Sequence, residues 1–145
     1  MVSGVDPSAL RAAREKAGLT QHELARLVGA AGGERVSRWE LGSSTPRPEF
    51  LVKLAQALGI ATMGLIRLDG DVPDLRALRL QAGVNVPELA DSANLAVPTY
   101  YSWEQGRWTR LPAASTIETL ARVLEQPVDV VAAAFHEAQR QRRQR

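Results

Sequence analysis

The stretch "LTQHELARLVGAAGGERVSRWELG", residues 19–42, contains two helix patterns separated by a glycine-rich break. Thr20 and Glu23 stand at the spacing of a capping box, which opens a helix because each side chain satisfies a free backbone N–H of the first turn. The "GAAGG" run then breaks this helix and allows a sharp turn. Beyond it, "ERVSRWE" places Val36 and Trp39 on one helical face. The stretch therefore predicts two short helices joined by a tight turn.

Helix patterns continue on both sides of this stretch. A capping side chain followed by a proline opens the helices that we expect over residues 6–17 and 45–58. Leucine and alanine recur within them at helical spacing, and a glycine follows each of them. A shorter helix is expected over residues 62–68. Residues 6–68 are therefore predicted to form one unit of five helices.

The chain repeats this unit. "LRAAREKAGLTQHELA" and "LRALRLQAGVNVPELA" start 65 residues apart and agree at nine of sixteen positions. The motif Trp-Glu-x-Gly returns after 64 residues, and "IETLARVLEQ" follows "LVKLAQALGI" after 66 residues. Such self-similarity is typical of a duplicated structural unit, and the changing offset indicates small insertions and deletions in loops.

The second copy shows the same order of helix patterns. Pro87 and Pro98 fall in first turns, where a missing N–H costs little. The helices of this copy are expected near residues 73–82, 86–93, 97–105, 113–125 and 128–142. We therefore predict an all-α chain with two domains, residues 6–68 and 73–135, followed by a basic helical tail, residues 136–145.

The composition favours a helical protein with a packed core. Of the 145 residues, 45% are hydrophobic, and alanine and leucine are abundant. Cysteine is absent, which excludes disulfides and thiolate metal sites. The first residues lack the basic and apolar regions of a signal peptide, and no apolar run has the length of a membrane span. We therefore expect a cytoplasmic protein without a membrane partner.

The net charge of +2 is unevenly distributed along the chain. Residues 1–68 carry nine basic and six acidic side chains, whereas residues 69–135 carry five basic and nine acidic ones. Residues 136–145 carry four arginines and one glutamate. This segregation indicates a polyanionic partner for the two ends rather than for the middle.

These elements, taken in order, resemble a known family. "LTQHELARLVG", "RVSRWELGSSTP" and "FLVKLAQALG" closely resemble the Cro/C1-type (XRE) helix-turn-helix family, and the second copy resembles a more divergent member. The resemblance covers about residues 8–68 and 73–135. It implies two tandem five-helix, lambda-repressor-like helix-turn-helix domains that bind double-stranded DNA in the nucleoid of a bacterium.

The resemblance also implies a scaffold that both copies retain. In the family, an arginine of the first helix forms a salt bridge with the glutamate of the Trp-Glu-x-Gly stretch. The matching residues are Arg14 with Glu40 in the first copy, and Arg79 with Glu104 in the second. The tryptophans of both stretches are then core residues, and the glycines end the third helices.

Further positions of the first copy match or suit DNA contacts. The candidates for base contacts are Gly33, Glu34, Arg35 and Arg38. Arginine suits guanine, and glutamate accepts from the amino group of cytosine. The candidates for phosphate contacts are Thr20, Gln21, Ser37 and Arg47. The alternative is that these side chains only stand in solvent, and an extra residue between Gly29 and Val36, compared with the family, leaves the base-facing register open.

The second copy lacks most of these polar residues. Its candidate contacts are Val97, Pro98, Thr99, Tyr101 and Ser102 on the third helix, with Arg107, Trp108 and Arg110 in the following loop. Without cations on the helix its DNA contacts would be weak, so it is either a second half-site reader or an auxiliary module. Trp108 either grips the DNA backbone, anchors a protein or folds back onto the core. The basic tail either stands in solvent or contacts DNA without sequence preference.

The leading hypothesis is a sequence-specific transcription regulator whose third helix in the first copy reads a major groove. One chain would act as a monomeric pseudo-dimer, or as a weak homodimer, on an asymmetric operator. The alternative is an interaction module whose second copy docks a toxin, a polymerase subunit or another regulator through Tyr100, Tyr101 and Trp108. No enzymatic activity, cofactor or metal site is predicted, because no phosphate-binding glycine loop or metal-ligand spacing is present.

Overall fold

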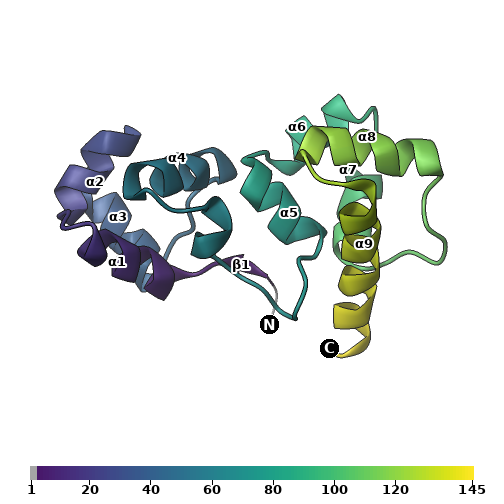
Figure 1. Ribbon diagram of the computed structural model, residues 1–145, viewed down its shortest axis with the longest axis horizontal. Helices are drawn as coiled ribbons and strands as arrows, with labels where there is room; N and C mark the ends of the chain where they lie inside the picture. The colour runs from purple at the N-terminus through teal and green to yellow at the C-terminus, as the bar shows by residue number, and fades with distance from the viewer. Residues whose placement is uncertain (1–2) are drawn as a thin grey trace.

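Two helical units of the same design follow each other in this computed structural model, which describes residues 3–145. The first unit contains β1 (Gly4–Val5), α1 (Pro7–Lys16), α2 (Gln21–Val28), α3 (Gly33–Leu41), α4 (Pro48–Leu58), the 3-10 helix η1 (Thr62–Leu65) and β2 (Ile66–Arg67). The second contains α5 (Leu75–Ala82), α6 (Val86–Ser92), α7 (Val97–Glu104), α8 (Ala114–Leu124) and α9 (Val128–Arg143). Figure 1 shows the units side by side with α5 between them. The predicted all-α fold is confirmed.

The second helix of each unit begins at a side-chain cap and is followed by a residue in the left-handed conformation. In the first unit, the Thr20 hydroxyl accepts from the Glu23 N–H at 3.0 Å, and the Glu23 carboxylate accepts from the Thr20 N–H at 2.9 Å. Helix α2 then ends at Gly29, whose φ of +73° is the left-handed conformation that glycine adopts without strain. In the second unit Asn94 takes this place with a φ of +56°, which asparagine tolerates better than most residues.

The extra residue of the first unit is absorbed in the turn between the second and third helices. Residues 30–32 precede α3, whereas only residues 95–96 separate the left-handed residue from α7. Val36 on α3 and its counterpart Tyr100 on α7 are both fully buried. The third helix therefore meets the core in the same register in both units.

Helix α4 begins at Pro48 rather than at the expected Thr45–Pro46. Arg47 is extended, with φ of −63° and ψ of 155°. The ring of a following proline disfavours the α conformation in the residue before it, so the helix cannot run back through Arg47.

The expected fifth helix over residues 62–68 is wrong beyond its first turn. Only η1 is helical there, and the chain then becomes extended in β2. This strand pairs antiparallel with β1, with Gly4 opposite Arg67 and Val5 opposite Ile66. In a helix, the N–H and C=O groups of these residues would bond within the segment. Here, groups of β2 form hydrogen bonds with β1 instead.

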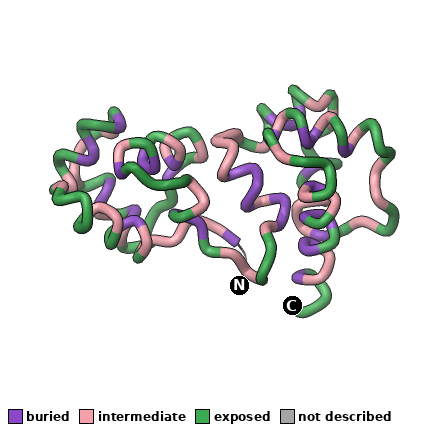
Figure 2. Tube along the Cα trace, viewed as in Figure 1, coloured by how far each residue is buried: buried purple, intermediate pink, exposed green. Residues whose placement is uncertain are grey.

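Each unit has its own core, and Figure 2 shows buried residues in both. The first core is centred on Leu10, Leu24, Val36, Trp39, Leu51 and Leu54, and the second on Leu78, Leu89, Tyr100, Leu120 and Phe135. Helix α2 buries Leu24, Ala25 and Val28, whereas its Leu27 is 62% exposed and lies outside the core.

Helix α5 contributes to both cores. Its Leu78 belongs to the second core, whereas Ala77 and Leu80 pack with the first. At its end, Gly83 lies so close to Val52 of α4 that a Cβ would stand 2.6 Å from a methyl carbon. Apolar packing on two sides of one helix therefore holds the units in a set orientation.

Helix α9 runs through the expected domain boundary at residue 135. Phe135, Ala138 and Gln141 are buried on it at helical spacing. Residues 136–143 therefore complete the second unit, and the expected basic tail at residues 136–145 is not a separate segment. The apolar pattern fades after Phe135, which is why the sequence alone suggested an end there.

Replacing Leu80 tests the shared core. Leu80 is 5% exposed, and Leu80→Ala should lower the free energy of unfolding by about 2–4 kcal/mol, because it removes buried methyl groups and leaves a cavity. Leu41 is 75% exposed, so Leu41→Ala is the matched control and should change stability by less than about 0.5 kcal/mol. Urea unfolding followed by circular dichroism measures both. Equal stability of the two variants would show that α5 does not serve the first core.

Candidate nucleic-acid interface

A buried ion pair ties α1 to α3 in the first unit. Arg14 donates from Nε to one carboxylate oxygen of Glu40 at 2.6 Å and from Nη2 to the other at 3.1 Å. Its Nη1 donates to the Leu19 carbonyl at 2.8 Å. Hydrogen bonding to Glu40 raises the pKa of the Arg14 guanidinium above its ordinary value. The guanidinium thus holds α1, the loop after it and α3 in one geometry.

The second unit repeats this arrangement. Arg79 donates to the two oxygens of Glu104 at 2.8 and 3.0 Å and to the Val84 carbonyl at 3.2 Å. Burial lowers the pKa of the Arg79 guanidinium, but the hydrogen bonds and charge of Glu104 outweigh burial and leave this pKa raised. Both ion pairs implied by the family resemblance are therefore present.

Gln21 extends the first ion pair toward the surface. Its Nε2 donates to Glu40 Oε1 at 3.1 Å, which holds the amide at the first turn of α2. The first backbone N–H groups of a helix have no partner within it and can bind an anion, and the Thr20 hydroxyl accepts only from that of Glu23. The matching residue in the second unit is Val86, which cannot hydrogen-bond in this way. The residue predicted to contact a phosphate at this position is therefore held by a hydrogen bond only in the first unit, where it is Gln21.

Three charged side chains of α3 face solvent. Glu34, Arg35 and Arg38 are exposed, and none of them forms an ion pair with another residue in the range 3–145. They line an open hollow together with Gly32, Gly33 and Ser44. The opposite face of the helix buries Val36 and Trp39. Helix α3 therefore presents a charged, unpaired surface from a fixed base.

An aromatic ring of α4 supports one of these side chains. The Arg35 guanidinium carbon lies 5.9 Å from the centre of the Phe50 ring, and Lys53 Nζ lies 5.5 Å from it. Such contacts attract a cation to the ring face and contribute about 0.5–1 kcal/mol at exposed sites. Sequence reasoning missed Lys53, because only the packing of Phe50 of α4 against Trp39 of α3 shows that Arg35 and Lys53 contact the same ring.

Gly33 has a packing role at the start of α3. A Cβ at this position would stand 3.1 Å from the backbone nitrogen of His22 on α2. The glycine thus allows the two helices to approach closely. Its predicted base contact, like the predicted phosphate contact of the half-buried Ser37, stays a prediction.

The starts of α4 and α6 meet between the units. Arg47, Pro48 and Glu49 line a hollow together with Asn85, Pro87 and Glu88. Arg47 is exposed, and α6 is the counterpart of α2. In Figure 1 both α3 and α7 lie on the side of the molecule away from the viewer. The third helices of the two units therefore lie on the same side of the molecule, with α4 and α5 between them along its length.

The exposed part of α7 offers few polar groups. Val97, Pro98, Thr99 and Tyr101 are exposed. The Ser102 hydroxyl donates to the Thr99 carbonyl within the helix at 2.8 Å. The helix carries no lysine or arginine. It therefore lacks the side chains that make bidentate contacts to guanine or anchor phosphates.

Two aromatic candidates of the second unit are core residues. Tyr100 is fully buried, and burial raises the pKa of its hydroxyl well above the ordinary value. Trp108 donates its indole N–H to the Phe135 carbonyl at 3.1 Å, and its ring packs edge-on against the Phe135 ring. Of the three alternatives for Trp108, the structure shows the one in which it folds back onto the core, because its single donor is used and its ring is half-buried. Arg107 and Arg110 beside it remain exposed.

The described residues offer no obvious metal site. Across residues 3–145, no three histidine, aspartate or glutamate side chains lie close enough together to hold a metal ion. His22 is exposed on α2, and His136 packs against the Trp108 ring at a centroid distance of 5.3 Å.

No helix among residues 3–145 is long and apolar enough to cross a membrane.

Known protein families match both units. A family described as "Helix-turn-helix" matches residues 10–65, and one described as "Helix-turn-helix domain" matches residues 74–134. The two matches together cover most of the chain, and residues 66–73, the segment before α5, separate them. No curated protein and no solved structure matches the chain significantly.

Breaking the first ion pair tests its role as a scaffold. Glu40→Ala should lower the free energy of unfolding by about 3 kcal/mol. The Glu40 side chain is 3% exposed, and its loss leaves Arg14 and Gln21 without a hydrogen-bond acceptor in a buried place. Glu15→Ala is the control, since it breaks an exposed pair with Arg11 and should leave stability nearly unchanged. Urea unfolding measures both. A loss for Glu40→Ala no larger than the loss for Glu15→Ala would contradict this role.

Proposed function

Because the chain belongs to the Cro/C1-type helix-turn-helix family, in two tandem copies, we propose that it is a sequence-specific transcription regulator. Helix-turn-helix domains of this kind bind DNA. The observation that carries the proposal is the surface of α3, where Glu34, Arg35 and Arg38 are exposed and unpaired within residues 3–145. This helix enters a major groove and reads base edges.

Each polar side chain of the first unit has a role in this proposal. Arg35 and Arg38 donate to O6 and N7 of guanine, and Glu34 accepts from the amino group of cytosine. The start of α2, with Gln21 beside it, binds a backbone phosphate, and Arg47 binds a flanking one. The half-site of the first unit therefore contains G·C pairs.

The second unit is proposed as an auxiliary module that reads no bases. Three observations support this choice over a second half-site reader. Helix α7 carries no cation, the Ser102 hydroxyl is used within the helix, and Val86 replaces the amide of Gln21. The unit keeps the fold while lacking the side chains that discriminate between base pairs.

A protein-docking role for α7 has less support. Tyr100 is buried and Trp108 is folded back, so two of the three expected anchors are core residues. Tyr101 remains, at 46% exposure, next to Val97. One half-exposed tyrosine is a small anchor for an interface, since binding energy concentrates in clustered aromatic and arginine residues.

Removing Arg38 tests the proposed readout. Arg38→Ala should weaken binding to a duplex selected by the full chain from random sequence by about 10- to 100-fold, because it removes a bidentate guanine contact. Arg26→Ala is the matched control, since Arg26 is exposed on α2 beside Leu27 and should matter little. Fluorescence anisotropy at one fixed salt concentration measures both. Equal binding by the two variants, or selection of no preferred sequence, would refute base readout by α3.

The symmetry of the selected sequence tests the division between the units. We expect an asymmetric site bound by one chain, because only the first unit carries base-reading side chains. Sedimentation of the complex gives the number of chains on each duplex. A palindromic site occupied by two chains would show instead that each chain reads one half-site with its first unit.

A further inference from the structure

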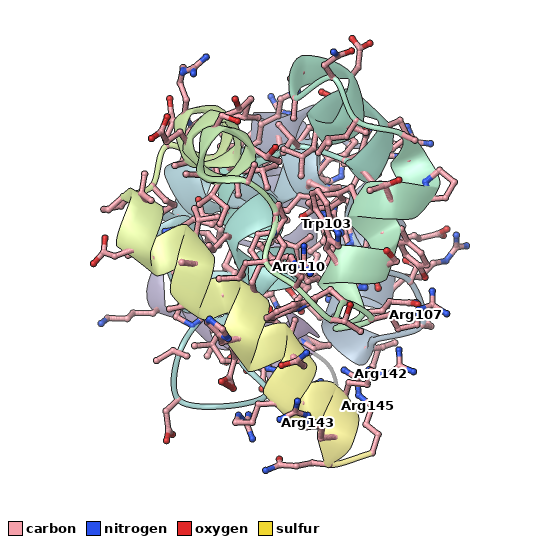
Figure 3. The ribbon with its side chains drawn as sticks, turned by 90° about the vertical axis from the view of Figure 1, so that its right-hand side faces the viewer. Trp103, Arg107, Arg110, Arg142, Arg143 and Arg145 are labelled. Atoms are coloured by element: carbon pink, nitrogen blue, oxygen red, sulfur yellow. The ribbon has the colours of Figure 1, made fainter. Side chains whose placement is uncertain are left out.

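Four arginines gather on the second unit, outside α7. Arg107 comes from the loop between α7 and α8, Arg142 and Arg143 end α9, and Arg145 follows that helix. All four are exposed, and Figure 3 shows them together at one end of the molecule, with Arg110 of the same loop lying apart. We call these four residues the arginine cluster.

Hydrogen bonds and close packing fix the two segments that carry the cluster. The Gln139 side chain donates to the Trp108 carbonyl at 2.8 Å, and the Trp108 indole donates to the Phe135 carbonyl. A Cβ on Gly106 would stand 2.3 Å from the Ala138 carbonyl oxygen, so the loop lies directly against the backbone of α9. The arginines therefore project from a rigid base, which lowers the entropic cost of binding a ligand.

The charge of the cluster is not neutralised within the described chain. Three of its members, Arg107, Arg142 and Arg143, line an open hollow of about 650 Å³ that has no acidic side chain in its wall. No cluster member forms an ion pair among residues 3–145. Arg145 also borders a smaller hollow that contains Asp74 and Glu104.

Nearby carboxylates already have partners. Glu137 is paired with Arg140, and Glu104 with Arg79. The Asp74 carboxylate accepts from an N–H at the start of α5 at 2.9 Å. The cluster is thus a site of concentrated positive charge on a unit whose helices otherwise carry an acidic excess.

Part of the arginine cluster lies in a loop that has a counterpart in the first unit. The loop between α7 and α8 corresponds to the loop between α3 and α4, which holds Arg47. Both loops follow the third helix of their unit, and α3 and α7 lie on the same side of the molecule (Figure 1). The shared helix α5 holds the two units in one orientation.

We propose that the arginine cluster binds the sugar–phosphate backbone of DNA that flanks the site read by α3. This inference rests on the proposed function and assigns the second unit its contact. Guanidinium groups bind phosphates bidentately, and four of them concentrate positive charge on one surface. An acidic protein is the less favoured partner, because the one aromatic ring in the hollow, Trp108, is folded onto the core.

The test uses the full chain and two duplexes that contain the same selected sequence. One duplex ends at the edge of this sequence, and the other continues for about one helical turn, roughly 10 bp, on each side. The cluster variant carries Arg107→Gln, Arg142→Gln and Arg143→Gln. The matched control carries Arg26→Gln, Arg67→Gln and Arg122→Gln, which are exposed arginines elsewhere and give the same change of charge.

We expect the wild-type chain and the control to bind the longer duplex more tightly than the shorter one. The cluster variant should lose this gain, with an affinity for the longer duplex about 10- to 100-fold lower than that of the wild type. The slope of log K against log salt should fall by about 2–3, because three phosphate contacts are lost. A variant with lysine at the same three positions should retain most of the slope, since it keeps the charges.

Two outcomes would overturn the inference, and they are distinguishable. If the wild-type chain selects a sequence but the cluster variant binds the longer duplex with unchanged affinity and slope, the cluster serves another partner, such as an acidic protein. If the wild-type chain binds no duplex, the proposed function fails together with the inference. Circular dichroism of each variant shows whether its helices are intact.

Discussion

The hydrogen-bonded ion pair between Arg14 and Glu40 is the contact on which the candidate DNA surface depends. It joins α1, the loop before α2, and α3, and the same carboxylate accepts from Gln21. One buried carboxylate therefore sets the position of α3 relative to the first turn of α2, the two elements that the proposed function brings to DNA. Salt screens exposed charges far more than buried ones. The geometry should therefore persist under conditions that weaken binding to phosphates.

Duplication has preserved this contact while the exposed residues diverged. Arg79 and Glu104 repeat the geometry of the first pair to within a few tenths of an ångström. Buried positions tolerate few changes, because an unpaired charge or a cavity lowers stability by several kcal/mol. Exposed positions on α7 had no such constraint. The second unit thus keeps the fold without cations on α7, and exposed arginines lie on another of its surfaces.

Helix α5 turns two similar units into one body. Its Ala77 and Leu80 complete the first core, and its Leu78 belongs to the second. Two separate chains on one operator associate to a degree that depends on their concentration. Here the spacing between α3 and the arginine cluster is set within one chain by apolar packing. Such a chain presents one arrangement of the proposed base-reading and phosphate-binding groups at any concentration.

Local signals in the sequence were sufficient for most of the helices and for the duplication. The capping box at Thr20, the left-handed Gly29 and the helical spacing of buried leucines act within a few residues, so they can be recognised without a fold. Both ion pairs and the exposed charges of α3 came from matching positions to the family. The tertiary structure alone decided that β2 pairs with β1, that α5 serves two cores and that Trp108 folds inward. These features depend on contacts between segments far apart in the chain. A pattern within a few residues carries no information on the energy of such contacts.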